Sequence, residues 1–471
     1  MATSLDTGQF THLQDVMATL PMTRSFIPFC LAFSTPDSVN DKSIVNALKE
    51  ALSKLSGAFP YLPGQVVLED FIPEIGIPKD NVKAGIELLV RDRRQEAPSL
   101  AELRQAKYPF SLLDGGLFTP PIVSSWKPTE QPAPVIIFQA SFVQGGMILG
   151  IFGNHTQMDC VGMGEVTRMM AKIMSGIDLS EDELTLGNQP RGHVIPLLGD
   201  EFQPQSGPGT ELDDVYLKPT SFSTAAGFAS IDMTSPPRWV YLNFTEANLR
   251  RLKDEAAREG LEPNTPYITT DDAICALLWQ RINKARHSRL GTYTSRLGRV
   301  VNVRKCFGLQ GYLGNMGDTV EYLDDAEKTG VDIWKKPLGS VASQLRAGLQ
   351  AEQYDTVIKH HMQALATMLD RSKGEEKNKL GFGANVDFNR DLYVSSYTKV
   401  FQCCDWSFGP LLGVPEVGRR PQMANSALPG LLMFMPKSKS GDLAVAAALS
   451  ELDIATLRGD ETLMSFAEFL D

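Results

Sequence analysis

The amino-acid sequence predicts an α/β fold of two lobes with mixed sheets. The chain has 471 residues, which is more than one hydrophobic core usually serves. Apolar strand-like segments alternate with amphipathic helices on both sides of residues 187–223, a stretch rich in proline and glycine. A loop of that length is unusual inside one compact domain. We therefore expect an N-terminal lobe at residues 1–190, a crossover linker at 191–224 and a C-terminal lobe at 225–471.

The first half begins with a strand and a helix. Residues 25–33 are almost continuously apolar, as in a buried strand. Residues 43–56 follow helical spacing, and their apolar side chains are Ile44, Leu48, Leu52 and Leu55. One face of this helix is therefore expected to pack against a core. Gly57 and the segment 60–64 end the helix, because proline and glycine interrupt helices.

Two further strands, at residues 135–142 and 147–154, are joined by the turn Val143-Gln144-Gly145-Gly146. Glycine in such a turn is a strong signal for a β-hairpin. A helix follows, with Met163, Met169, Met170 and Met174 on one face. A methionine stripe of this kind is more typical of core packing than of a ligand surface.

The second half restarts with a strand at residues 239–244, after which Thr245 caps a helix that runs to about Arg258. Thr270-Asp271-Asp272 begins another helix and places carboxylates at the positive end of its dipole. Further strands are expected at residues 299–303, 319–323, 392–401, 430–435 and 442–449, the last two as a hairpin.

Charge and cysteine usage exclude several classes of protein. The net charge of −11, from 45 basic and 56 acidic residues, argues against general nucleic-acid binding, which needs a basic footprint. The apolar stretches are far shorter than the about 20 residues that cross a membrane, and the N-terminus lacks the pattern of a secretory signal. The six cysteines lack the spacing of a disulfide framework or a zinc site. We expect a cytoplasmic protein with no metal, nucleic-acid or membrane partner.

The sharpest chemical feature is His155-Thr156-Gln157-Met158-Asp159, where the predicted strand 147–154 turns toward a helix. Side chains in such connections often project into clefts. A histidine with its ordinary pKa of about 6.5 is largely neutral at pH 7 and can accept a proton from a hydroxyl. The spacing from His155 to Asp159 also occurs by chance, and a lone histidine is more often structural. Spacing alone therefore leaves both interpretations open.

Other segments along the whole chain favour the catalytic interpretation. They are Pro60-Tyr61-Leu62-Pro63-Gly64, Phe142 to Gly146, Thr269 to Ala273 with Trp279, Val301 to Arg304, Gly311 to Asn315, and Phe408-Gly409 with Gly413 and Arg419-Arg420. Together with the histidine motif they resemble the acyltransferase superfamily called BAHD, and within it the fungal trichothecene 3-O-acetyltransferases. The last segment is similar to the second signature of that superfamily, written DFGWG.

The resemblance implies two lobes like those of chloramphenicol acetyltransferase, with a channel between them. His155 would be the general base for an O-acyl transfer. Asp159 would hold the turn through a salt bridge to Arg304 rather than relay charge. The acyl donor would be acyl-CoA, acetyl-CoA by analogy, as a co-substrate rather than a tightly bound cofactor. The acceptor would be a hydroxyl of a small specialised metabolite, and the enzyme would be a monomer.

The resemblance also suggests binding residues. Those expected to contact the acceptor or the developing oxyanion are Ser395, Ser396, Tyr397 and Asn315. An ordinary strand of the C-terminal sheet is the alternative for the first three. Basic residues that could bind the phosphates of the coenzyme are Lys305, Arg419, Arg420, Lys437 and Lys439.

The second signature departs from the family pattern at Ser407, where the family has an aspartate. Asp405 stands two residues earlier, so either it takes over the bracing role of that aspartate or the brace is absent. Two alternatives therefore stand beside the acyl-CoA-dependent transferase. One is an enzyme like a condensation domain, which forms amides or rings without free coenzyme A. The other is a non-catalytic binding protein on the same fold.

Overall fold

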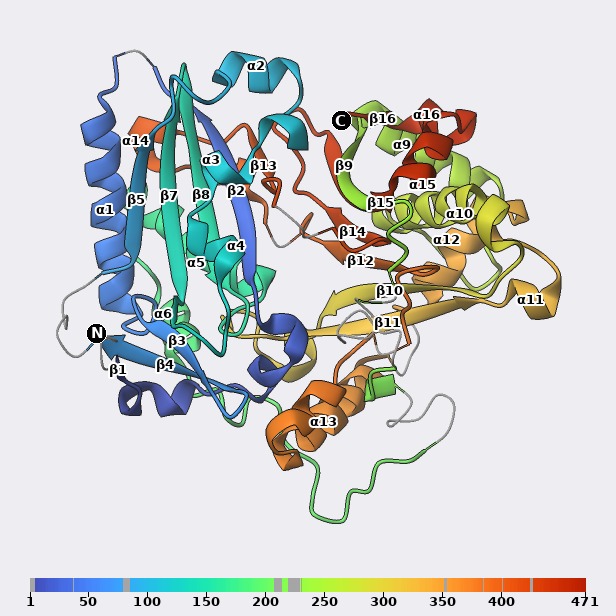
Figure 1. The fold of residues 1–471 in the computed structure, drawn as a ribbon, viewed down its shortest axis with the longest axis horizontal. Helices are drawn as coiled ribbons and strands as arrows, with labels where there is room; N and C mark the ends of the chain where they lie inside the picture. Colours follow the sequence, from blue (N-terminus) through green and yellow to red (C-terminus); the bar gives the residue numbers. More distant parts are fainter. Residues whose placement is uncertain are drawn as a thin grey trace.

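The computed structural model describes residues 5–36, 38–78, 85–206, 214–218, 229, 231–350, 354–383, 385–399, 401–423 and 427–471. Two large mixed sheets lie side by side with helices packed around them, and a smaller sheet flanks the first one (Figure 1). Within the described ranges, no helix combines the length and the apolar character that a membrane span requires.

The first large sheet has five strands in the order β13-β2-β8-β7-β5. Their bounds are β13 Val417–Arg419, β2 Phe26–Ser34, β8 Gly146–Asn154, β7 Ile136–Val143 and β5 Glu87–Asp92. Strands β7 and β8 form the predicted antiparallel hairpin, whereas β5 runs parallel to β7. Strands β7 and β8 are buried along their whole length, because side chains on both faces of the sheet are covered.

Alternate residues of β2 show how both faces are covered. Phe29 and Leu31 share a core with the apolar side of α1 (Asp41–Ala58) and of α5 (Cys160–Met174). Cys30 and Ala32 point the other way and share a core with the short helices α2 (Leu100–Gln105) and α3 (Gly115–Phe118). Helix α4 (Pro121–Ser125) packs against a separate small cluster that contains Phe26. The predicted methionine stripe of α5 lies in the first core.

The second large sheet has seven strands in the order β11-β10-β12-β14-β15-β9-β16. Their bounds are β11 Gly317–Asp324, β10 Ser295–Asn302, β12 Leu392–Ser396, β14 Leu431–Phe434, β15 Leu443–Ser450, β9 Pro237–Phe244 and β16 Glu468–Phe469. Strands β10, β12 and β14 are parallel, and β14 and β15 form the predicted antiparallel pair. The expected strand at 392–401 is too long, since β12 ends at Ser396 and residues 398–399 form a turn.

Helices cover the face of this second sheet that is turned away from the first (Figure 1). They are α9 Glu246–Arg258, α10 Thr270–Leu290, α12 Leu338–Ala347, α15 Glu451–Arg458 and α16 Glu461–Phe466. Thr245 caps α9 as predicted, and Thr269 caps α10 with a reciprocal hydrogen bond from Asp272. Trp279 of α10 is fully buried, and its indole N–H donates to Ser295 at 2.8 Å.

A third core joins the N-terminal segment to the second half. Helix α13 (Tyr354–Arg371) packs there with Met17 and Leu20 of the first turns, with Ile195 of the predicted linker, and with Tyr312. Further helices are α6 Glu181–Asn188, α11 Ala326–Thr329 and α14 Gly409–Leu412. The small sheet, in the order β1-β4-β3-β6, contains β1 Leu5–Asp6, β4 Ile72–Pro78, β3 Gln65–Glu69 and β6 Ala133–Pro134.

Strand β13 crosses the expected division of the chain. It comes from the range 225–471, yet it pairs antiparallel with β2, where Gly418 lies opposite Leu31. The approach is close, because a Cβ atom on Gly418 would lie 2.6 Å from the ring of Phe29. The division at 190 and 224 stays a prediction from the sequence, but the second range contributes a strand to the first sheet.

Candidate active site

His155 directly follows β8 and is fixed by its backbone. Its N–H donates to the carbonyl of Ser25 at 2.8 Å, which extends the pairing of β8 with β2. The turn behind it is tightened by Asn154, whose Oδ1 accepts from the backbone N–H of Thr156 at 3.1 Å and from its hydroxyl at 2.7 Å. Asn154 and Thr156 are fully buried. The imidazole therefore stands on a rigid turn.

Asn315 sets the proton arrangement of the His155 ring. Its Nδ2 donates to the backbone carbonyl of His155 at 2.9 Å, so its Oδ1 is the atom that faces the ring, 3.2 Å from Nδ1. An amide oxygen only accepts, so Nδ1 carries the hydrogen and Nε2 keeps its lone pair. Burial lowers the pKa of His155 below its usual 6.5 by disfavouring the charged form. The geometry gives a neutral imidazole with a basic Nε2.

Asp159 caps the N-terminus of α5, and both of its carboxylate oxygens bind partners other than His155. Its Oδ1 accepts from the N–H of Gly162 at 2.9 Å, and its Oδ2 accepts from the N–H of Met316 at 3.0 Å. Arg304 forms a bidentate ion pair with both oxygens, at 2.8 and 2.9 Å. Burial alone would raise the pKa of Asp159, but the charge and hydrogen bonds of Arg304 outweigh it and hold the pKa below 3.8.

Arg304 is buried, with 1% of its surface exposed, and all its guanidinium nitrogens are used. Besides the two bonds to Asp159, its Nε donates to the carbonyl of Tyr312 at 2.8 Å and its Nη2 to that of Gly314 at 2.6 Å. The predicted ion pair is therefore present, and it joins the start of α5 to the loop after β10. The contact is tight, since a Cβ on Gly162 would lie 2.0 Å from the carbonyl oxygen of Leu313.

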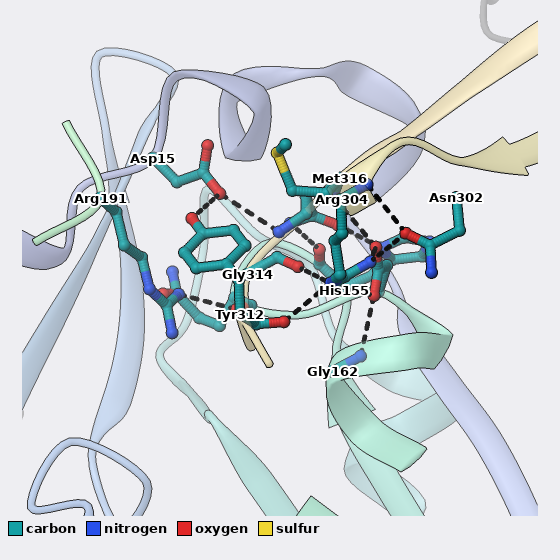
Figure 2. Close-up of polar contacts among 12 residues, drawn as sticks. Asp15, His155, Gly162, Arg191, Asn302, Arg304, Tyr312, Gly314 and Met316 are labelled. Atoms are coloured by element: carbon teal, nitrogen blue, oxygen red, sulfur yellow. Dashed lines mark hydrogen bonds and ion pairs between the residues drawn. The ribbon is translucent and has the colours of Figure 1, made fainter. Parts of the chain in front are cut away.

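A buried polar group that the sequence reasoning missed lies behind this loop. Asp15 accepts from the hydroxyl of Tyr312 at 3.0 Å and from the N–H of Asn315 at 3.2 Å. Arg191 lies over the ring of Tyr312, 5.8 Å from its centre (Figure 2). Its Nη1 donates to the carbonyl of Gln157 at 2.8 Å. Burial raises the pKa of Asp15, and the nearby charge of Arg191 opposes that rise. These contacts position Asn315, and through it His155.

The other predicted pocket residues are placed as follows. Ser395 and Ser396 end β12, and the hydroxyl of Ser396 donates to Asp271 at 3.1 Å, at the start of α10. Tyr397 follows and is 3% exposed; burial raises the pKa of its phenol, and the negative charge of Asp159 adds to that rise. Both polar ends of the Asn315 amide face His155. Contact of these four residues with substrate stays a prediction.

The second signature is held by a different residue from the one expected. Asp405 is exposed, so it does not replace the missing aspartate at Ser407 as a buried brace. Instead, the hydroxyl of Ser175, just after α5, donates to the carbonyl of Ser407 at 2.8 Å and accepts from the N–H of Gly409 at 3.2 Å. Gly409 has φ of 75° and lies against the carbonyl of Met174. A neutral hydroxyl thus holds the loop to the first lobe.

The predicted basic residues differ in environment. Lys305, Lys437 and Lys439 are exposed. Arg419 is 3% exposed and Arg420 is partly buried, so neither arginine is the solvated surface charge that is usual for this residue type. Within the described residues, no cluster of histidine, cysteine and carboxylate side chains could hold a metal ion.

Cys160 directly follows the motif, and its thiol is a candidate nucleophile. Burial raises the pKa of its thiol to about 12, and the carboxylate of Asp159 adds to the effect. A thiol must ionise to attack, so at neutral pH the site holds Cys160 in its unreactive form.

Comparison with known proteins decides the family. Residues 26–173 match the family model of the trichothecene 3-O-acetyltransferase-like N-terminal domain. Over 481 aligned residues the chain is 31% identical to an O-acetyltransferase of Cryptosporiopsis sp., with 100% of both chains covered. The chain belongs to the fungal trichothecene 3-O-acetyltransferase-like family.

Members of this family share the fold of the chain. The trichothecene 3-O-acetyltransferase of Fusarium sporotrichioides is 29% identical over 96% of this chain and 95% of its own length. A crystal structure of the Fusarium graminearum enzyme with coenzyme A and deoxynivalenol has a TM-score of 0.85 at 26% identity, covering 97% of this chain and 99% of that one. The predictions of a BAHD-type two-lobed α/β fold and of an acyltransferase are confirmed.

Proposed function

We propose that this family member moves an acyl group, acetyl in the first instance, from acyl-CoA to a hydroxyl of a small specialised metabolite, with His155 as general base. The observation that carries the proposal is the pair of hydrogen bonds between Asn315 and His155, which leaves Nε2 as the basic nitrogen. The lowered pKa of His155 keeps that nitrogen unprotonated at neutral pH. The complex of the F. graminearum relative with coenzyme A and a small-molecule acceptor supports the substrate classes.

In this mechanism the acceptor hydroxyl donates its proton to Nε2 of His155 while its oxygen attacks the thioester carbonyl. The hydroxyl groups of Ser395 or Tyr397 are the proposed donors to the tetrahedral oxyanion, since the hydroxyl of Ser396 donates to Asp271. The intermediate then breaks its carbon–sulfur bond, and the thiolate takes the proton from the imidazolium. The products are an ester and free coenzyme A. A positioned base of this kind contributes about 10²–10⁴-fold. Asp159 and Arg304 hold the geometry and exchange no proton.

The test is the His155→Ala variant, assayed with acetyl-CoA and a panel of hydroxylated metabolites by product mass spectrometry. We expect turnover to fall by at least about 10²-fold with an unchanged thermal melt. His193→Ala is the matched control, because His193 is exposed and its loss should leave turnover intact. Retained turnover in His155→Ala would refute the mechanism.

Calorimetry with acetyl-CoA separates the two rival functions. An enzyme like a condensation domain needs no free coenzyme A, so an absence of binding by the wild-type chain would favour it. Binding without ester formation on any acceptor would favour a non-catalytic role.

A further inference from the structure

Two adjacent arginines, Arg419 at the end of β13 and Arg420 directly after it, form no ion pair with a carboxylate among the described residues. Arg419 lies opposite Cys30 of β2 and uses Nη1 for the carbonyl of Gly418, at 3.1 Å. Arg420 directs its Nη1 to the sulfur of Met433, at 3.3 Å. The Nε atoms of both side chains are buried, and among the described residues neither has a hydrogen-bond acceptor.

Three buried arginines elsewhere in the chain have the carboxylate partner that Arg419 and Arg420 lack. Arg286 pairs with Asp453 at 3.0 Å, Arg299 with Asp272 at 2.7 Å and Arg304 with Asp159 at 2.8 Å. By contrast, the ionisable side chains that influence the pKa values of Arg419 and Arg420 are phenols and thiols, among them Tyr241 and Cys404. Burial lowers the pKa of both guanidinium groups, and the phenols and thiols offset that fall only in part. A buried cation without a counter-charge is costly.

Aromatic rings surround the two charges without neutralising them. Arg419 lies over the ring of Tyr241, 5.4 Å from its centre, and Arg420 over that of Trp239, at 5.2 Å. Tyr241 also donates to the backbone carbonyl of Arg420 at 3.1 Å and accepts from its N–H at 2.9 Å. Stacking occupies the faces of a guanidinium, but its N–H groups lie in the plane of the group and point outward. Those edges suit a bidentate anion.

The position of the pair fits the reaction. Arg419 belongs to the first sheet, whereas Trp239 and Tyr241 of β9 and Met433 of β14 belong to the second. The charge of Arg420 influences the pKa of Tyr397, and so does the charge of Asp159, the last residue of the His155 motif. The pair thus lies where the two sheets meet.

We propose that Arg419 and Arg420 form a built anion site that receives a phosphate group of the acyl-CoA donor. The inference rests on the proposed function and deepens it by naming the residues that recognise the donor. The whole chain carries a net charge of −11, which repels a polyanionic ligand, so binding requires a local positive site. The two unpaired guanidinium groups supply it.

The test compares donors with and without phosphate in variants Arg419→Met, Arg420→Met and the double variant. For Arg420→Met we expect the Kd for coenzyme A, measured by calorimetry, to rise about tenfold to a hundredfold. The KM for S-acetylpantetheine, which lacks every phosphate, should stay unchanged. Dephospho-coenzyme A, which lacks the 3′-phosphate, identifies the phosphate that is bound. If the 3′-phosphate is the ligand, Arg420→Met should leave the Kd for dephospho-coenzyme A unchanged. If another phosphate is the ligand, that Kd should rise as it does for coenzyme A. Arg250→Met is the control, because Arg250 is a surface residue with 71% of its side chain exposed.

The stability of the ligand-free variants is a second readout. Removing an uncompensated buried charge should leave the melting temperature unchanged or raise it, whereas a bracing arginine would lower it. If wild type and double variant bind coenzyme A with equal affinity, the proposed site is wrong. It is also wrong if the variants lose affinity for S-acetylpantetheine as much as for coenzyme A, or if they lose affinity only for donors with an acyl carboxylate, such as succinyl-CoA. Failure of the wild-type chain to bind coenzyme A would instead count against the proposed function itself.

Discussion

Replacing Asp159 with alanine should destabilise the folded protein rather than abolish the activity of the molecules that remain folded. The change removes the acceptor of four hydrogen bonds, from Gly162, from Met316 and two from Arg304. It also strands the Arg304 guanidinium at 1% exposure with no counter-charge. Breaking a buried ion pair by removing one partner costs about 3–5 kcal/mol. This figure includes the loss of the helix cap. Against a total stability of about 5–15 kcal/mol, the loss is large.

Urea denaturation and soluble yield measure this loss. We expect Asp159→Ala to reduce soluble yield at least as much as it reduces activity per folded molecule. The double variant Asp159→Ala/Arg304→Met removes the stranded cation as well, so it should be more stable than Asp159→Ala alone. A stable, fully folded and inactive Asp159→Ala protein would contradict this reasoning and would point to a direct catalytic role of the carboxylate.

Three other outcomes are expected. The acid limb of kcat/KM should have its midpoint below pH 6.5, because burial lowers the pKa of His155 and activity appears as pH rises through that pKa; a midpoint above 6.5 would contradict the environment described. Asn315→Ala should lower kcat roughly fivefold to tenfold through the lost hydrogen bond. Asn315→Asp should move the acid limb to higher pH, because a carboxylate beside the imidazole ring raises the pKa of His155. Gly162→Ala should destabilise by about 1–3 kcal/mol in urea titrations, since overpacking has nowhere to relax, whereas Gly57→Ala, with nothing within 4 Å of the added carbon, should not.

Local pattern and resemblance together predicted much of the fold and part of the site. Helix α1, the hairpin β7–β8 and the caps of α9 and α10 follow from periodicity and capping chemistry, which are local. Strand β4 was missed because Pro73 and Pro78 disguise it, and β5 because most of it is exposed at a sheet edge. The three residues of β13 are too few to show a period.

The partners within the site were harder to foresee. The ion pair between Asp159 and Arg304 was expected from the family resemblance, not from spacing, since 145 residues separate the two. Asp15 lies 297 residues from Tyr312 in a segment whose composition is unremarkable, so nothing local identified it. Ser175 differs in kind, because it replaces an expected carboxylate with a neutral hydroxyl. Contacts across such separations depend on the tertiary fold alone.

The pairing of β13 with β2 has a consequence for how the chain is made. Ribosomal synthesis delivers β2 early, while β13 emerges only after residue 416. Until then the backbone edge of β2 lacks its outer neighbour, and unpaired edges of apolar strands attract other chains. A nascent or truncated chain that ends before β13 would therefore expose an adhesive edge, and should need chaperone protection until synthesis is nearly complete.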